Sequence, residues 1–328
     1  AAAAATPIIL NLTLIGALLG LSEVTETPGH ALAIGVSAAG VLRFAWLIVA
    51  LRRAGIALRL PRPRLTPRVK HMLILIAPAA LGAGVAQVNL VVDVIIASLL
   101  PEGAVSFLYY ADRINQLPLG VIGVAVGTAL LPLLSRQLRA AQDEAAGQAQ
   151  NRAIEGALLL TLPAAAALMI IAEPVISVLF ERGAFSAVAT AASADALIAY
   201  AAGLPSFVMI KVLVPGYFAR QDTKTPVRIA IVCLTVNIAF NLILMGPLGH
   251  VGIALATTLS GWLNAALLAR GLHQRGYFTA DPRLRRRLPR MLLATLAMAA
   301  ALWAVSAALS GPLGASLGTG VGSLLALM

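Results

Sequence analysis

Charged side chains stand in the middle of long apolar segments, and a membrane-spanning segment rarely contains a charge unless it binds something or pairs with another group. Asp93 precedes the turn at 101–103 by about nine residues, and Asp112 and Arg113 follow it by about ten. At 1.5 Å per helical residue, all three lie roughly 15 Å from the turn. A carboxylate at that depth can bind a cation, and a guanidinium can bind phosphate.

Asp112 and Arg113 point about 100° apart because they are neighbours on one helix, so both cannot face the same cavity. Arg113 is the better cavity candidate, since its fork of donors stays charged and binds phosphate at two points. A buried structural ion pair is the alternative. Lys211 also lies within an apolar segment, close enough to a basic loop to extend toward it, and ranks behind Arg113.

Oxygen ligands for a hard cation lie at a similar depth in a second hairpin, whose turn is at 246–249. Asn237 and Asn241 share one helical face, and Thr257 and Thr258 stand opposite, roughly 10–16 Å from the turn. With Asp93 supplying the charge, this set suits Na⁺. Hydrogen bonding between helices is the alternative.

The elements that position these residues are expected to be transmembrane helices. The chain has 328 residues, of which 60% are hydrophobic and 11% charged, whereas a soluble domain has about 25% charged residues. The alternating strands of a membrane barrel are absent, so the fold class is all-α, a polytopic bundle of about ten spans. These spans are expected near 2–21, 31–51, 72–99, 104–134, 153–172, 190–214, 226–246, 249–270, 289–309 and 312–328.

The net charge of +11 comes from a few loops. Of the 24 Lys and Arg residues, 20 lie in loops 52–71, 135–152, 215–228 and 270–290. These are every second connection, so they share one side, which is the cytoplasm by the positive-inside rule. The expected partners of these residues are membrane lipids, and no nucleic acid is expected.

The sequence is typical of part of a larger bundle. It opens on AAAAA inside an apolar run and ends at Met328 inside another, and LNLTLIG at 10–16 resembles FNLILMG at 240–246. Two homologous six-helix lobes would give this offset of six spans, with four helices missing upstream. Chance similarity between short apolar strings is the alternative.

Nothing in the sequence predicts an enzyme. It has no glycine-rich phosphate loop and no histidine-rich metal spacing, and no organic cofactor is expected. The segment 173–186 is expected to form a short amphipathic element on the outer side.

Two stretches are similar to a known family: SFLYYADRINQLPLGVIGVAVGTALLPLLSRQ at 106–137 and KVLVPGYFARQDTKTPVRIAI at 211–231. They resemble the MurJ/MviN family of lipid II flippases. The resemblance implies helices 5 to 14 of a two-lobe, six-plus-six exporter fold with two extra C-terminal helices. Residues 1–70 would end the first lobe, 71–271 would form the second, and 272–328 would form a truncated helix pair.

The resemblance also implies a function. The family moves lipid II, the undecaprenyl-pyrophosphate-linked peptidoglycan precursor, from the inner to the outer leaflet of the bacterial inner membrane by alternating access. Arg113 matches a cavity arginine and Asp112 its neighbour, so both are substrate-binding candidates, with Lys211 a third.

A sodium site of the family matches five positions of this chain, and Na⁺ is therefore a candidate bound or coupling ion. One ligand that can be Asp in the family is Asn here, which leaves a single formal charge. The five positions are Asp93, Asn237, Asn241, Ile253 through its carbonyl, and Thr257.

Two other functions fit the same sequence. One is a related exporter of a drug or of another lipid-linked glycan, because a fold does not fix a substrate. The other is a non-transporting membrane scaffold, which predicts that Arg113, Asp93 and Asn237 all tolerate replacement.

Overall fold

A computed structural model describes residues 5–55, 66–67, 69–70, 84 and 87–310. Within these ranges the secondary structure is helical and contains no strand. The chain divides into two compact units, Ala1–Lys70 and His71–Met328, and each is described by itself.

The first unit is a pair of helices, α1 (Thr6–Leu21) and α2 (Pro28–Arg53). The Thr27 side chain accepts a hydrogen bond from the backbone N–H of His30 and so caps the start of α2. A side chain at Gly35 would place its Cβ 2.8 Å from that of Ala17, so glycine permits the close approach of the two helices.

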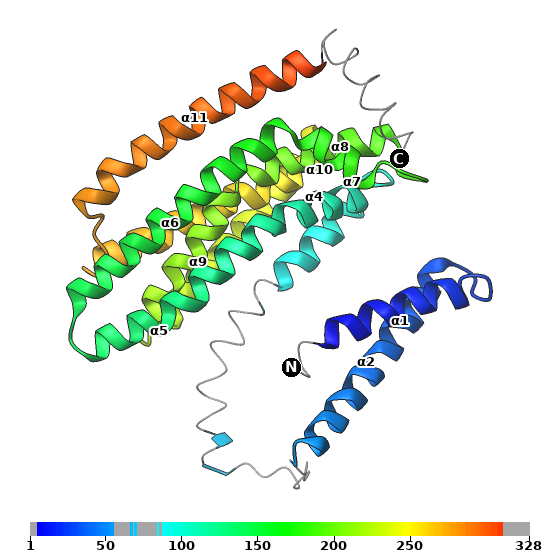
Figure 1. Ribbon diagram of the computed structural model, residues 1–328, viewed down its shortest axis with the longest axis horizontal. Coiled ribbons are helices and arrows are strands. Elements are labelled where there is room, and N and C mark those ends of the chain that lie inside the picture. The colour runs from blue at the N-terminus through cyan, green and yellow to red at the C-terminus, as the bar shows by residue number, and fades with distance from the viewer. Residues whose placement is uncertain (1–4, 56–65, 68, 71–83, 85–86, 311–328) are drawn as a thin grey trace, which may run out of the picture. The chain divides into compact units, whose positions relative to one another are not determined.

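The second unit is a bundle of long helices (Figure 1). The bundle begins with the helix Gln87–Ala97. Its other elements are α4 (Ala104–Pro118), the π-helical segment η2 (Leu119–Val124), α5 (Ala125–Arg139), α6 (Asp143–Ile170), α7 (Ala172–Phe180), α8 (Ala187–Ala201), α9 (Leu204–Phe218), α10 (Lys224–Gln274) and α11 (Pro282–Ser310).

Two predicted spans are joined within α10. Gly249 interrupts its helical backbone with a φ of 55°, a conformation that glycine adopts without strain. The Ser260 hydroxyl donates to the carbonyl of Cys233 at 2.8 Å, so the two halves lie side by side. The element is therefore a helical hairpin whose turn is at the predicted position.

By length and composition, four helices of the described ranges could cross a membrane: α2, α6, α10 and α11. The pair α8 and α9, bent by 40°, raises the number to five. The predicted fourth span is divided into α4, η2 and α5. Half of the predicted third span and all of the tenth lie outside the described residues.

Two helices begin well before the predicted residue. The fifth span was expected from residue 153 and the ninth from 289, but α6 begins at Asp143 and α11 at Pro282. Arg152 and the basic run 283–290 therefore lie in helices and not in the predicted loops. The same is true of Arg52, Arg53, Arg136, Arg139, Arg228 and Arg270. A search for apolar runs does not detect the first turns of α6 and α11, because these turns consist of polar residues that precede the hydrophobic segment of the helix. A short helix is present where the segment 173–186 predicted a short element, since α7 spans Ala172–Phe180.

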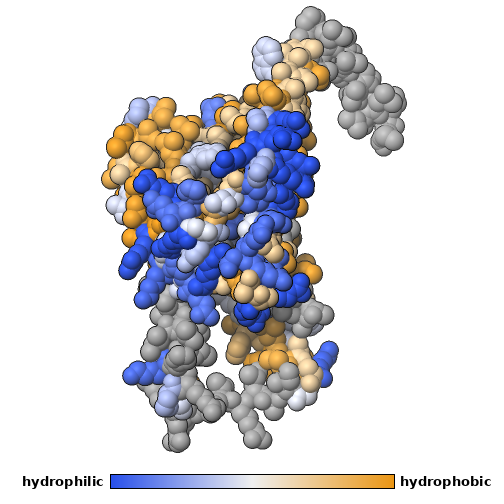
Figure 2. All heavy atoms as spheres, turned by 90° about the vertical axis from the view of Figure 1, so that its left-hand side faces the viewer, coloured by the Kyte–Doolittle hydropathy of each residue, from blue (hydrophilic) through white to orange (hydrophobic). Residues whose placement is uncertain are grey.

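Hydrophilic side chains gather on the face of the molecule shown in Figure 2, which is viewed from the left-hand side of Figure 1. The ends of α5, α6 and α11 lie on that side. The basic residues of α11 that this end exposes are Arg283, Arg285, Arg286, Arg287 and Arg290.

Two apolar clusters hold the second unit together. One joins α5, α6, α9, the end of α10 and α11, with Leu134, Val212 and Leu272 fully buried. The other joins the helix Gln87–Ala97 to α4, α7, α8 and the middle of α10 around Ile176 and Leu197. The polar side chains of the candidate functional site lie between these helices.

Candidate functional site

Asp93 lies at the centre of a polar cluster between the helix Gln87–Ala97 and both arms of α10. Its Oδ1 accepts a hydrogen bond from Asn241 Nδ2 at 2.6 Å, and its Oδ2 lies 3.4 Å from Thr257 Oγ1. Asn241 Nδ2 also donates to Asn237 Oδ1 at 3.0 Å. The structure thus brings together four side chains that were predicted from helix depth alone.

Ile253, the fifth predicted ligand, enters the cluster through its backbone. Its carbonyl oxygen accepts a hydrogen bond from Thr257 Oγ1 at 3.1 Å, one helical turn away. The Ile253 side chain is fully buried on the apolar side of the helix. Each of the five predicted positions therefore supplies an oxygen atom to the cluster.

The donor set fits a hard cation. Asn241 Oδ1 is buried and has no hydrogen-bond partner among the described residues, and an unpaired buried acceptor is costly. The amide nitrogen of Asn241, and not this oxygen, faces Asp93. Turning the amide by 180° would aim Oδ1 at Asp93, and a small cation between the two oxygens would then satisfy both. The described residues contain no group of three His, Cys, Asp or Glu side chains suited to a metal, so the cluster relies on amide, hydroxyl and carbonyl oxygens.

Asn89 is a member of the cluster that the sequence analysis missed. Its Nδ2 donates to Asp93 Oδ2 at 3.0 Å. Turning the Asn237 amide by 180° brings its nitrogen within 3.0 Å of Asn89 Oδ1. The signal was present in the sequence, because a polar residue four positions before Asp93 lies on the same helical face.

Not every polar residue at this depth joins the cluster. Thr258, next to Thr257, donates to the carbonyl of Ala199 on α8 at 2.7 Å. This hydrogen bond holds α10 against α8, as hydroxyl groups commonly do between the helices of membrane bundles.

Asp112 and Arg113 lie in different environments on α4, as their angular separation predicts. Asp112 is half-buried, and its carboxylate accepts a hydrogen bond from Gln116 one turn later. Arg113 is exposed, and its guanidinium lies over the ring of Tyr109, 4.6 Å from the ring centre. The two do not form an ion pair.

Lys211 lies on α9 against the π-helical segment. A Cβ at Gly123 would come 2.5 Å from Lys211 Cδ. The Lys211 side chain can therefore pass this close to η2 because residue 123 has no side chain. The six-residue segment η2 follows Pro118, whose ring cannot donate to the helical ladder. Single π turns inside longer helices often mark functional positions.

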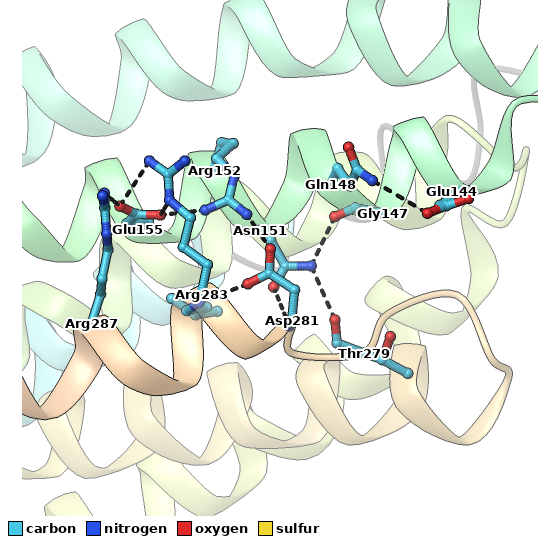
Figure 3. Close-up of polar contacts among 11 residues, drawn as sticks. Glu144, Gly147, Gln148, Asn151, Arg152, Glu155, Thr279, Asp281, Arg283 and Arg287 are labelled. Carbon is cyan, nitrogen blue, oxygen red and sulfur yellow. Dashed lines mark hydrogen bonds and ion pairs between the residues drawn. The ribbon is translucent and has the colours of Figure 1, made fainter.

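A second polar cluster, absent from the sequence analysis, joins α6 to the start of α11 (Figure 3). Glu155 is 7% exposed. It pairs with Arg152 at 2.5 Å, with Arg283 at 3.2 Å, and with Arg287. One carboxylate thus contacts three guanidinium groups.

Asp281 and Asn151 complete this junction. Asp281 pairs with Arg152, and its Oδ1 accepts a hydrogen bond from the N–H of Leu284 at 2.7 Å, which caps α11. Asn151 donates to the carbonyl of Thr279 at 3.0 Å and accepts from the N–H of Asp281 at 3.1 Å. The start of α11 is therefore fixed to α6 at several points.

Curated proteins that are similar to this chain include probable lipid II flippases of two bacteria. The chain is 47% identical over 302 residues to a probable lipid II flippase MurJ of Rhizobium meliloti (strain 1021), covering 91% of the chain and 56% of the relative. A probable lipid II flippase MurJ of Vibrio cholerae serotype O1 is 41% identical over 273 residues, covering 83% and 52%. The chain spans about half the length of these relatives.

Solved structures give the fold. A structure titled as lipid II flippase MurJ in an inward closed conformation matches with a TM-score of 0.72 and 25% identity, covering 93% of this chain and 66% of that one. An outward-facing multidrug resistance MATE transporter of the MOP superfamily matches with a TM-score of 0.53 and 21% identity, covering 71% and 52%. The described bundle thus has the fold of these exporters.

The family comparison covers nearly the whole sequence. The model of the family described as "Lipid II flippase MurJ" matches residues 1–317. Together with the exporter fold, this match confirms the resemblance drawn from the two motifs. The chain belongs to the lipid II flippase MurJ family, whose members are multi-pass membrane proteins of bacteria.

Proposed function

We propose that the protein moves lipid II from the inner to the outer leaflet of the bacterial inner membrane, with its basic loops in the cytoplasm. The observation that carries the proposal is Arg113, an exposed guanidinium on α4 in the middle of an apolar segment. Its donors match the oxygens of a pyrophosphate. Family membership supports lipid II as the lipid that bears this group.

The headgroup contact would use the polar side of α4. Arg113 would bind the pyrophosphate at two oxygens, because its N–H groups form a planar fork. Asp112 is held by Gln116 and would shape the site without pairing with the arginine. Lys211 lies across η2 on α9 and would add a second positive charge at longer range.

The cluster around Asp93 would bind Na⁺. The side-chain oxygens of Asp93, Asn237, Asn241 and Thr257 would hold the ion, together with the carbonyl of Ile253. A bound cation neutralises Asp93 and stabilises the contact between the helix Gln87–Ala97 and α10. It would thereby favour one conformation of an alternating-access cycle, because a ligand shifts the equilibrium toward the state that binds it better.

Complementation tests the transport role. The intact gene carrying Arg113→Ala should fail to rescue a bacterium depleted of its own lipid II flippase, while membrane immunoblots show normal protein levels. Arg113→Lys keeps the charge without the fork and should rescue only partly. Arg270→Ala, at an exposed arginine of α10, is the matched control and should rescue fully.

The substrate is tested in the same strains. Lipid II should accumulate in cells that depend on Arg113→Ala, which separates a flippase from an exporter of a drug or of another lipid-linked glycan. Full growth with both Arg113→Ala and Arg113→Lys would overturn the assigned role of this residue.

A further inference from the structure

Three arginines of the described residues lie over aromatic rings. Arg113 lies 4.6 Å from the ring centre of Tyr109, and Arg220 lies 4.4 Å from that of Tyr277. The third pair, Arg275 over Tyr217, is longer at 5.6 Å. The first two pairs have nearly the same distance between guanidinium and ring. Arg113 and Arg220 can therefore be compared by the other contacts that each guanidinium makes.

Two of the three arginines also use their N–H groups within the protein. Arg220 Nη1 donates to the carbonyl of Gly216 at 2.9 Å. Arg275 pairs with Asp222, and its Nη2 donates to Thr225 Oγ1 at 2.8 Å. Each of these guanidinium groups therefore has at least one N–H group bonded to a neighbouring part of the chain.

Arg113 makes neither a hydrogen bond nor an ion pair with any residue that the structure describes. Its neighbour Asp112 forms no ion pair with it, and that carboxylate accepts a hydrogen bond from Gln116. The ring of Tyr109 is the contact that holds the guanidinium. A ring face attracts the flat face of the cation and leaves its five in-plane N–H groups free.

We propose that Tyr109 is a positioning residue that holds Arg113 as a receptor for a phosphate or pyrophosphate anion without occupying its donors. The inference rests on the proposed function of Arg113 and adds to it the means by which the receptor is kept both in place and open. A carboxylate partner would fix the guanidinium equally well, but it would compete with the anion for the same N–H groups.

Tyr109 is itself held by a set of aromatic rings. Its ring meets that of Tyr110 edge to face at 5.9 Å. Tyr110 packs against Phe180, 4.8 Å away at the end of α7, and against Phe185 at 4.9 Å, before the start of α8. The connection between α7 and α8 therefore supports the receptor. Tyr109 itself is 54% exposed.

Substitutions that keep or remove the ring test the proposal. The protein from the intact gene is solubilised in detergent, and its affinity for undecaprenyl pyrophosphate is measured by native mass spectrometry. Tyr109→Phe should bind as the wild type does, because it keeps the ring. Tyr109→Leu should bind roughly 3- to 30-fold more weakly, the range of a cation–π contact. A fluorinated phenylalanine at position 109 keeps the ring's shape but weakens its negative face, and should fall between them.

Tyr277→Leu is the matched control, because it breaks a cation–π pair of almost equal length. The arginine of that pair, Arg220, donates a hydrogen bond within the protein. The affinity of this variant for the probe should not change. A double-mutant cycle then assigns the mechanism: in an Arg113→Ala background, Tyr109→Leu should cause no further loss.

The outcomes separate this inference from the proposed function. If Arg113→Ala weakens binding and Tyr109→Leu does not, Tyr109 is not the positioning residue and only this inference is overturned. Losses that add in the double variant, or a fluorinated ring that binds as well as phenylalanine, overturn it too. If Arg113→Ala binds as the wild type does, both the inference and the role of Arg113 fall.

Discussion

Two carboxylates in the same bundle have opposite surroundings. Glu155, between α6 and α11, contacts the guanidinium groups of Arg152, Arg283 and Arg287. Asp93, between the helix Gln87–Ala97 and α10, contacts only amides and a hydroxyl, and it is absent from the ion pairs of the described residues. One negative charge is overcompensated by the protein, whereas the other is left for something else to neutralise.

The difference explains why one cluster is structural and the other a candidate binding site. The guanidinium groups around Glu155 already neutralise its charge and join α6 to α11. Around Asp93, neutral donors orient the carboxylate without cancelling its charge, which keeps a mobile cation favourable. A carboxylate thus serves two purposes in this bundle. With Arg152, Arg283 and Arg287, Glu155 forms an ion-pair cluster that joins two helices, the lock, whereas Asp93 forms a candidate cation site.

The largest expected effect comes from breaking the lock. Glu155→Gln should lower the stability of the protein by about 2 kcal/mol, between the values for exposed and for fully buried ion pairs, because its arginines are a third to a half exposed. Thermal unfolding in detergent measures the change. Glu144→Gln, at an exposed position of α6, should be neutral. Equal melting temperatures for the two variants would show that the cluster is not a lock.

Asp93→Asn should act in the opposite way. Without Na⁺ it should not destabilise the protein, because it removes an uncompensated charge. The wild type should gain about 1.4 kcal/mol at a Na⁺ concentration ten times its Kd, and the variant should gain nothing. Melting temperatures in NaCl and in KCl of equal ionic strength give both quantities.

The converse change sharpens the same prediction. Asn241→Asp places a second carboxylate 2.6 Å from Asp93 Oδ1, which should increase the stabilisation by Na⁺ and destabilise the protein without it. A sodium response that survives in Asp93→Asn would remove Asp93 from the site.

The smallest effect is expected at Asp222, a half-buried carboxylate whose one guanidinium partner among the described residues is Arg275, itself exposed. Burial alone would raise its pKa, but hydrogen bonds from Thr225 and Arg275 lower it overall. The charged form therefore stabilises the fold above the unfolded pKa of about 3.9, and this contribution is lost as the pH falls through the lower folded value. Asp222→Asn should cost about 0.5 kcal/mol at pH 7.

The pH dependence checks the sign. The melting temperatures of the wild type and Asp222→Asn should differ at pH 7, differ equally at pH 5.5, and converge as the pH falls below 4. A difference that grows on acidification would contradict the lowered pKa.

The sequence predicts the depth of polar residues better than their neighbours. Asp93, Asn241 and Thr257 meet as expected because helix rise and turn positions fix their heights. That the helix Gln87–Ala97 packs against α10 depends on lateral contacts, which spacing along one chain does not specify. Asn89 could have been found from its i,i+4 relation to Asp93, and Tyr109 from the same relation to Arg113.

The lock around Glu155 could not be predicted in this way. Its arginines come from helix turns beyond the apolar runs, so hydropathy assigned Arg152 and Arg283 to loops. Arg152 is one helical turn from Glu155, but Arg283 and Arg287 are more than a hundred residues away in sequence, and only packing of the whole bundle brings them to the carboxylate.

The arrangement of the lock also sets an order of events during biosynthesis. Arg283 is made 128 residues after Glu155, which corresponds to roughly 6 to 25 s of translation at about 5–20 residues per second. Throughout that interval Arg152 is the sole member of its guanidinium set already synthesised. The nascent bundle therefore inserts its earlier helices with this carboxylate incompletely paired, and the emergence of α11 from the ribosome completes the junction.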